Sequence, residues 1–322
     1  MNSTGEIKIE SKKVWTALVT NLSYLTGLLT LDYSLKKSGS KYPLVALFTD
    51  GLPSEGLNIL KARRIPTRHI SFLQPTVHKD YGNDVRFYNC WSKLASFSLV
   101  EYDRVVQLDS DMLVLQNMDE LMDLELDDAA LGGRGQRVFA ACHACTCNPL
   151  DIPHYPSDWF PKNCAYSSQH SNPDQAQVQG PPTGRRETML NGGLLVLNPS
   201  EEIYNTILCQ LEDPTATMRY AFADQSLLSD IYQKRWVPLP YIYNALKPMR
   251  WPGVHSQIWR DYKVKNLHYI LSSKPWDDED LEGWGSKQKR YSVTDETHDW
   301  WWKINNERMA EEKANGIIRD GF

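Results

Sequence analysis

Short apolar runs rich in β-branched residues alternate along the chain with segments whose leucines recur at helical spacing. The opening stretch shows this most clearly, with an apolar run at 14–20, a helical leucine pattern at 24–37 and a second apolar run at 44–49. Strands that alternate with helices in this way are typical of a sheet with right-handed crossovers. With 322 residues, 41% of them hydrophobic, the chain can bury the core of one large α/β domain.

The same patterns continue through most of the chain. Strands are predicted at 14–20, 44–49, 68–73, 105–108, 189–197, 237–241 and 267–271. Helices are predicted at 24–37, 57–64, 91–102, 201–211, 224–232 and 295–313. Between about 132 and 187 Gly, Pro, Cys and His dominate, which indicates a long irregular insertion. We therefore predict a polar segment at 1–13, one domain at 14–276 that contains the insertion at 132–187, and a helical tail at 277–322.

Charge and hydropathy narrow the classes of partner. Lys and Arg number 35 against 40 Asp and Glu, so we expect no nucleic acid and no anionic membrane surface as a partner. No run approaches the roughly 18 apolar residues of a spanning helix, and the polar segment 1–13 lacks the apolar core of a signal peptide. These features, and six cysteines in a chain of this length, predict a cytoplasmic protein with reduced thiols.

Two carboxylates follow directly on the strand predicted at 105–108. Asp109 and Asp111 are two residues apart, so in extended backbone both side chains leave on the same side while Ser110 points away. Like charges on one face repel unless a cation lies between them. Magnesium or manganese prefers oxygen ligands and keeps positions open for substrate phosphates. The pair thus predicts a metal site that holds a diphosphate at the carboxyl edge of the sheet.

The pair has two other interpretations. A strand end closed by solvated acids explains Asp109 and Asp111 without a metal, and the pair alone does not exclude it. A calcium loop of the EF-hand type would place Glu120 at its twelfth position, but Val114 stands at the sixth, where the sharp turn requires Gly. The calcium interpretation therefore fails.

Several motifs occur in a fixed order along the chain: Val19-Thr20-Asn21 with Tyr24, Ser92-Lys93-Leu94, the run 102–111, Leu190-Asn191-Gly192-Gly193, Asp224-Gln225, Tyr243-Asn244 and the run 268–276. In order and spacing they resemble glycosyltransferase family 8 over about 14–276, the insertion excepted. The resemblance implies a GT-A fold, in which a Rossmann-like, mixed nucleotide-binding sheet forms a single domain. It also implies retaining, Mn²⁺-dependent transfer of a hexose from a UDP-sugar donor to an acceptor. Homodimers occur in the family.

The resemblance also implies roles for individual positions. Donor-binding positions fall on Thr20, Asn21, Tyr24, Lys93, Asp109, Ser110, Asp111, Gly192, Gly193 and Lys274. The metal ligands fall on Asp109, Asp111 and His268. The sugar and the reaction centre fall on Asn191, Asp224, Gln225 and Lys93. The chemistry is consistent, because charge builds on the UDP β-phosphate as it leaves, and a cation with two lysines would stabilise that charge.

Each of these residues also has a purely structural interpretation. Lys93 on a helix is commonly solvated, and His268 in an apolar strand is commonly a hydrogen-bonded core residue. Asp224 begins a helix, where an acid is favoured electrostatically. Asn191 with the two glycines after it is compatible with a tight turn. Only the shared order and spacing of the motifs favours the functional interpretation.

The acceptor is predicted from departures within the family. One branch glucosylates a tyrosine on itself, but here no Tyr follows Tyr243 in that segment and Trp251 falls near the acceptor's place, so self-glucosylation is not expected. Leu271 stands where that branch has Gly. The regions of Trp251 and Lys93 are most similar to the branch that transfers galactose from UDP-galactose to myo-inositol, so a small polyol or sugar is the predicted acceptor. Alternatives are transfer from UDP-glucose or UDP-N-acetylglucosamine to a glycan or protein, and non-catalytic UDP-sugar binding.

The insertion is rich in cysteine and histidine. Its close spacings could bind zinc, but they do not fit the paired patterns of structural zinc sites: Cys142, His143, Cys145, Cys147, His154 and Cys164. The favoured interpretation is a loop that folds over the acceptor site, because retaining transfer must keep water from the activated sugar.

Overall fold

The computed structural model describes residues 7, 9–183, 189–277, 296–317 and 320–322. The predicted polar segment 1–13 and the predicted tail 277–322 lie partly outside these residues. Among the helices of the described ranges, none is both long enough and apolar enough to cross a membrane.

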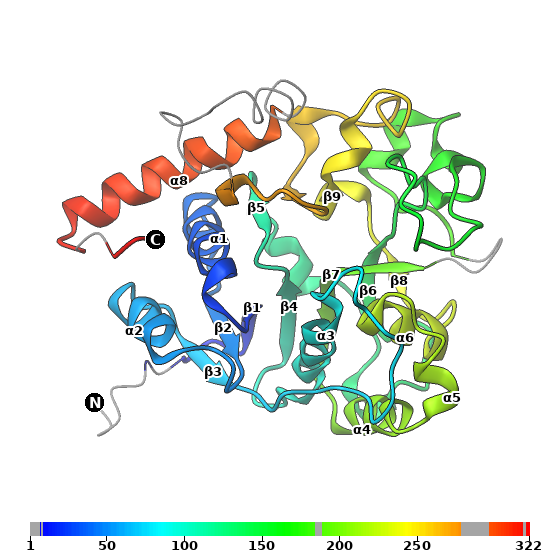
Figure 1. The fold of residues 1–322 in the computed structure, drawn as a ribbon, viewed down its shortest axis with the longest axis horizontal. Helices are drawn as coiled ribbons and strands as arrows, with labels where there is room; N and C mark the ends of the chain where they lie inside the picture. The colour runs from blue at the N-terminus through cyan, green and yellow to red at the C-terminus, as the bar shows by residue number, and fades with distance from the viewer. Residues whose placement is uncertain (1–6, 8, 184–188, 278–295, 318–319) are drawn as a thin grey trace.

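A seven-stranded mixed sheet forms the centre of the molecule (Figure 1). Its strands, in spatial order, are β3 (Thr67–His69), β2 (Leu44–Phe48), β1 (Lys13–Val19), β4 (Arg104–Leu108), β7 (Leu190–Leu197), β6 (Phe139–His143) and β8 (Val237–Pro238). Strands β3, β2, β1 and β4 are parallel. Strand β7 runs antiparallel to both β4 and β6, and β8 pairs in parallel with β6. The predicted α/β class with a mixed sheet is confirmed.

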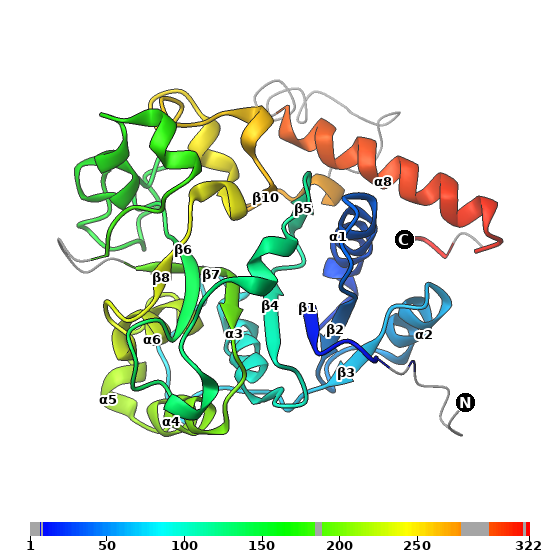
Figure 2. The same cartoon turned by 180° about the vertical axis from the view of Figure 1, so that it is seen from behind.

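Helices cover both faces of this sheet because its buried strands present apolar side chains on both sides. One face packs against the 3₁₀ helix η2 (Trp91–Ser98), α4 (Glu201–Leu211) and α6 (Ala223–Ile231). The other packs against α1 (Leu25–Lys37) and α2 (Ser54–Ala62). Short helices α3 (Phe87–Cys90) and α5 (Pro214–Thr217) precede η2 and α6. Helix α8 (Thr297–Ala314) lies beside α1, as both views show, and Asn305 accepts a 2.8 Å hydrogen bond from Thr30 (Figures 1 and 2).

A second, three-stranded sheet stands beside the first at the end of β4. Strand β10 (Asn266–His268) lies between β5 (Met112–Val114), to which it is antiparallel, and β9 (Ala245–Leu246), to which it is parallel. Its register places His268 opposite Met112, the residue after Asp111. Residues far apart in the sequence thereby meet just beyond the carboxyl end of β4.

The insertion is only partly irregular, which corrects the prediction for 132–187. Strand β6 lies inside that range and belongs to the main sheet, although Phe139–His143 contains no β-branched residue that would predict it. After His143 the chain forms the 3₁₀ turns η5 (Pro161–Asn163), η6 (Ala165–Gln169) and η7 (Pro173–Gln177). Tyr166 of η6 and Ala176 of η7 pack into a third apolar core with Tyr241 and Trp301.

Other predicted elements differ in type or extent. The helix predicted at 91–102 is the shorter 3₁₀ helix η2, and the helix predicted at 57–64 begins earlier as α2. The strand predicted at 68–73 is the three-residue β3 at the edge of the sheet. Strand β1 and helices α1, α4 and α8 match their predictions within about two residues, and boundaries are the least certain part of such predictions.

Candidate active site

One pocket lies at the carboxyl ends of β1 and β4, beside the first residues of the antiparallel strand β7. Nearly all of the site residues predicted from the sequence line it: Thr20, Asn21, Tyr24, Lys93, Asp109, Ser110, Asp111, Asn191, Gly193, Asp224, Gln225, His268 and Lys274. Gly192 stands between two lining residues, Asn191 and Gly193, and its N–H donates to Gln225 Oε1 at 3.2 Å. The structure therefore brings together residues that span more than 250 positions of sequence. Their individual roles remain predictions.

Asp109, Asp111 and His268 form a compact set of metal-type ligands. One oxygen of each carboxylate and one nitrogen of the imidazole all lie within 4.8 Å of one another. His268 Nε2 is 3.2 Å from an oxygen of Asp111 and 3.7 Å from an oxygen of Asp109. Two carboxylates and one imidazole on one side of an open pocket fit a divalent cation that keeps positions for substrate oxygens.

The orientation of His268 supports this fit. Its Nδ1–H donates to Asn244 Oδ1 at 2.9 Å, while the amide nitrogen of Asn244 donates to Asn191 Oδ1 at 2.9 Å. With the proton on Nδ1, the lone pair of Nε2 points toward the two carboxylates. A hydrogen bond on the far nitrogen is the usual way in which a protein fixes the tautomer of a metal-binding histidine. His268 is thus buried and hydrogen-bonded, as its structural interpretation requires, and it also presents a free ligand atom.

Lys274 pairs with the second aspartate. Its ammonium contacts Asp111 at 2.5 Å and donates to the Tyr269 carbonyl at 2.6 Å. Burial raises the pKa of Asp111, but the ammonium of Lys274 outweighs burial and holds the pKa below its usual range. Asp111 therefore stays ionised and available as a ligand.

Lys93 joins the metal-type set to the opposite side of the pocket. Its ammonium lies 3.2 Å from an oxygen of Asp109 and 3.2 Å from an oxygen of Asp224, and the residue is only 7% exposed. Burial lowers the pKa of Lys93, but the two carboxylates outweigh it and the pKa lies above its ordinary value. The interpretation of Lys93 as a solvated surface lysine is therefore wrong.

Asp224 is the pocket carboxylate whose pKa is raised most, which favours its neutral form. It lies in the first turn of α6 and is 2% exposed. Burial raises its pKa to about 6, partly offset by Lys93. Its Oδ2 accepts no hydrogen bond from the described parts of the chain and has only the ion contact with Lys93. Such an oxygen suits a hydroxyl donor supplied by a ligand.

The two glycines of β7 leave room for the side chains of Asp224 and His268 to approach the strand. A Cβ at Gly192 would lie 2.5 Å from Asp224 Oδ2, and one at Gly193 would lie 2.4 Å from the Cε1 atom of His268. Both glycines belong to the regular strand β7, so the interpretation of this motif as a tight turn is wrong. A glycine pair inside a strand here marks a close approach of side chains.

The predicted uridine positions lie at the end of β1. Asn21 caps the 3₁₀ helix η1 (Leu22–Tyr24) by accepting the Ser23 N–H at 3.1 Å, and the Tyr24 ring packs edge-on against Trp276. Burial and the nearby Asp111 raise the pKa of Tyr24, so its phenol is neutral. The hydroxyl of Ser110 donates to the Leu18 carbonyl at 2.7 Å and so helps to hold the end of β4 against β1.

Several pocket residues were missed from the sequence. Tyr155 and Trp159 of the insertion pack on Phe222, with Trp159 stacked at 4.5 Å, and the three line the pocket near Asp224. The insertion thus lines the pocket, but nothing in the sequence singles out these rings among many aromatic residues. Trp251, predicted near the acceptor, is not among the lining residues and packs on the third core instead.

Two further departures concern single residues. Arg86 lines the pocket and is held by Asp84, with 2.7 Å between Nε and Oδ1, which supplies a cation that the sequence did not suggest. Leu271 also lines the pocket and adopts a φ of 70°, a conformation that favours glycine and costs a branched residue on the order of 1 kcal/mol or more. Leucine therefore stands where glycine is expected, and the backbone still has the positive φ that glycine adopts most easily.

The sheet order and the position of the pocket are those of the GT-A fold. A similar solved structure is the galactosyltransferase LgtC in complex with donor and acceptor sugar analogs, with a TM-score of 0.56 and 14% identity over 91% of this chain and 96% of that chain. This likeness shows the fold.

The model of glycosyl transferase family 8 matches residues 15–280, and the chain belongs to that family. Galactinol synthase 4 of Arabidopsis thaliana is 27% identical over 312 residues, which cover 93% of this chain and 82% of that protein. Galactinol synthase 1 of Solanum lycopersicum is 27% identical over 304 residues, which cover 94% and 84%. The chain is therefore a hexosyltransferase that uses a nucleotide-sugar donor and an acceptor.

Proposed function

We propose that this protein is a retaining, Mn²⁺-dependent hexosyltransferase that uses a UDP-sugar, with galactose transfer from UDP-galactose to myo-inositol, the galactinol synthase reaction, as its specific activity. The observation that carries the proposal is the convergence of Asp109, Asp111 and His268 with two buried lysines and Asp224 in one pocket. The likeness to galactinol synthases over more than nine-tenths of the chain supports the choice of donor and acceptor.

The diphosphate of the donor would lie against the metal-type ligands Asp109, Asp111 and His268, which together form the carboxylate–imidazole set. Bound Mn²⁺ would neutralise charge on the diphosphate oxygens. Lys274 reaches the same set through Asp111, so its ammonium can turn toward the β-phosphate of the departing UDP. A buried ammonium aimed at a developing negative charge stabilises the transition state more than the ground state. On the uridine side, the neutral phenol of Tyr24 is available as a hydrogen-bond donor.

Asp224 is the carboxylate left for the transferred sugar. Among the described residues that line the pocket, Asp84 is paired with Arg86, while Asp109 and Asp111 belong to the metal-type set. We propose that Asp224 and Asn191 orient sugar hydroxyls and that the acceptor attacks on the face from which UDP leaves. The departing phosphate then accepts the proton of the acceptor hydroxyl, and configuration is retained.

The aromatic wall of the insertion suits a polyol acceptor. Tyr155, Trp159 and Phe222 present apolar faces beside the Asp224 carboxylate. Such a wall can pack on the C–H face of a cyclic polyol and exclude water, which would otherwise hydrolyse the donor. Polar and apolar surfaces that meet in this way are typical of sites for small molecules.

The test is UDP release with Mn²⁺ across a panel of UDP-sugars, each with and without myo-inositol, with mass spectrometry of the products. Release that requires both UDP-galactose and myo-inositol, with a hexosyl-inositol product, is the expected result. If no donor gives inositol-dependent release, the polyol acceptor is wrong, and the donor that is hydrolysed slowly by itself would then identify the sugar. Binding of UDP without turnover of any donor would favour a sugar-nucleotide binding protein.

A further inference from the structure

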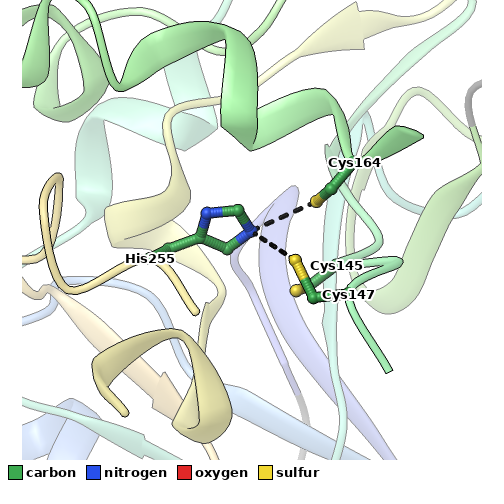
Figure 3. A group of neighbouring side chains, drawn as sticks. All are labelled: Cys145, Cys147, Cys164 and His255. Atoms are coloured by element: carbon green, nitrogen blue, oxygen red, sulfur yellow. Dashed lines mark hydrogen bonds between the residues drawn. The ribbon is translucent and has the colours of Figure 1, made fainter. Parts of the chain in front are cut away.

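A second cluster of metal-type ligands lies outside the carboxylate–imidazole set. Cys145 and Cys147 follow β6, Cys164 joins η5 to η6, and His255 lies in the turns after the 3₁₀ helix η9 (Lys247–Arg250) (Figure 3). Three Sγ atoms and one imidazole nitrogen all lie within 4.8 Å of one another. Cys147, Cys164 and His255 are buried, with at most 5% exposure.

The distances have the scale of a tetrahedral ligand shell. His255 Nε2 lies 3.2 Å from the Sγ atoms of both Cys147 and Cys164. Zn–S bonds of about 2.3 Å and Zn–N bonds of about 2.05 Å at tetrahedral angles place S and N atoms about 3.6 Å apart and S atoms about 3.8 Å apart. The four side chains therefore converge from three chain segments onto a volume that one ion would fill.

The histidine is held in the orientation that a ligand needs. The other ring nitrogen of His255, Nδ1, lies 2.9 Å from His170 Nε2. When Nδ1–H donates to His170, the single lone pair of Nε2 faces the sulfur atoms. That lone pair can accept a hydrogen bond from one thiol, yet two thiols lie at the same short distance from it. A metal ion satisfies all of these groups together, and the hydrogen bond to His170 is the outer partner that metal-binding histidines usually have.

We propose that Cys145, Cys147, Cys164 and His255 bind a structural zinc ion. Three cysteines and one histidine are a common structural zinc set, and four protein ligands leave no position for substrate. The other three candidates of the insertion are engaged elsewhere: Cys142 donates to the Pro240 carbonyl, His143 contacts the Pro181 carbonyl, and His154 packs edge-on against Tyr155. The sequence did not show the site because His255 follows Cys164 by 91 residues.

The zinc ion would fix the walls of the active-site pocket. Cys145 itself lines that pocket, as do Asn148 and Leu150 just beyond Cys147. On the other side of the cluster, Pro248 lines the pocket and His255 follows it along the same chain segment. The ion would join these two walls, whichever sugar is transferred. Its role is to position residues and not to take part in the reaction.

The experiment is metal analysis of the full chain, purified without chelator, by inductively coupled plasma mass spectrometry. We expect about one zinc ion per chain in the wild type and almost none in Cys164→Ser or His255→Ala. Cys142→Ser is the matched control, because this buried thiol lies three residues from Cys145 but outside the cluster. Asp111→Asn should also retain zinc, which separates this site from the carboxylate–imidazole set.

A second measurement on the wild-type chain covers the case in which the variants fail to fold. Exchange with Co²⁺ should produce sulfur-to-cobalt charge-transfer absorption and the intense visible bands of a tetrahedral site. Wild-type protein without zinc and without this spectrum would overturn the proposal. A disulfide among Cys145, Cys147 and Cys164, found by mass spectrometry after alkylation without reductant, would also overturn it, as would bound iron.

Discussion

Asn244 offers a direct test of how the candidate metal site is held. The residue is fully buried, and its side chain accepts from His268 Nδ1 and donates to Asn191 Oδ1, both at 2.9 Å. In Asn244→Ala the imidazole loses the partner that fixes its tautomer and ring orientation. Removing such an outer partner typically weakens metal affinity 10–100-fold, which corresponds to about 1.4–2.7 kcal/mol.

The assay is the Mn²⁺ dependence of initial UDP release at fixed UDP-sugar, together with urea unfolding. We expect the Mn²⁺ concentration for half-maximal rate to rise about 10–100-fold in Asn244→Ala. The buried partners left unpaired should also lower the free energy of unfolding by about 1–3 kcal/mol.

Asn117→Ala is the matched control. Asn117 also both donates and accepts through its amide, to the Ser38 carbonyl and from the Asp119 N–H, but it does not line the pocket. It should lower stability without changing the Mn²⁺ requirement. If Asn244→Ala is destabilised while its Mn²⁺ requirement equals that of the wild type, His268 is not a ligand positioned by Asn244.

Four further predictions address the same pocket. Asp111→Asn should abolish turnover and leave a folded chain, because it removes one charged ligand; normal UDP release by this variant, folded by circular dichroism, would disprove the metal assignment. Gly193→Ala should raise the Mn²⁺ requirement, because its Cβ would lie 2.4 Å from Cε1 of His268, whereas Gly39→Ala, with open space around its Cβ, should change stability only; equal Mn²⁺ titrations of the two variants would refute this. The pKa of Asp224 is raised to about 6, so the group is protonated below that pH, and kcat/KM should rise as pH increases through about 6. Because the pKa of Asp224 is higher in the folded state than in the unfolded chain, the free energy of unfolding should fall as pH rises from the ordinary carboxyl value to about 6. In Asp224→Asn this pH-dependent decrease should be absent from urea unfolding. A pH dependence of stability equal to that of the wild type would contradict the assigned burial.

Much of the fold follows from local sequence patterns. Strand β1 and helix α1 were predicted because apolar periods of two and 3.6 residues report directly on the local backbone state. Where the local signal is weak, the prediction failed. Strand β6 consists of small and polar residues around one Phe, and it exists because β7 and β8 pair with it on either side.

The candidate site divides in the same way. The order and spacing of the motifs were sufficient to select the residues that line the pocket, from Thr20 to Lys274. They did not reveal Asn244 as the partner of His268, or Tyr155 and Trp159 as a wall of the pocket. These contacts depend on how separate loops pack, and a single sequence carries no periodic signal for such packing.

The sequence by itself therefore determined the α/β class, the family and the pair of carboxylates at a strand end, because each depends on nearby residues or on the order of motifs along the chain. Only the tertiary structure decided which charged or metal-binding side chains lie in contact with each other. The antiparallel pairing of β5 with β10 brings His268 to Asp111, and the packing of the insertion brings Cys164 to His255. Direct ion pairs and metal-ligand bonds need atoms within a few ångströms of one another, so they depend on strand register and loop packing and not on distance along the chain.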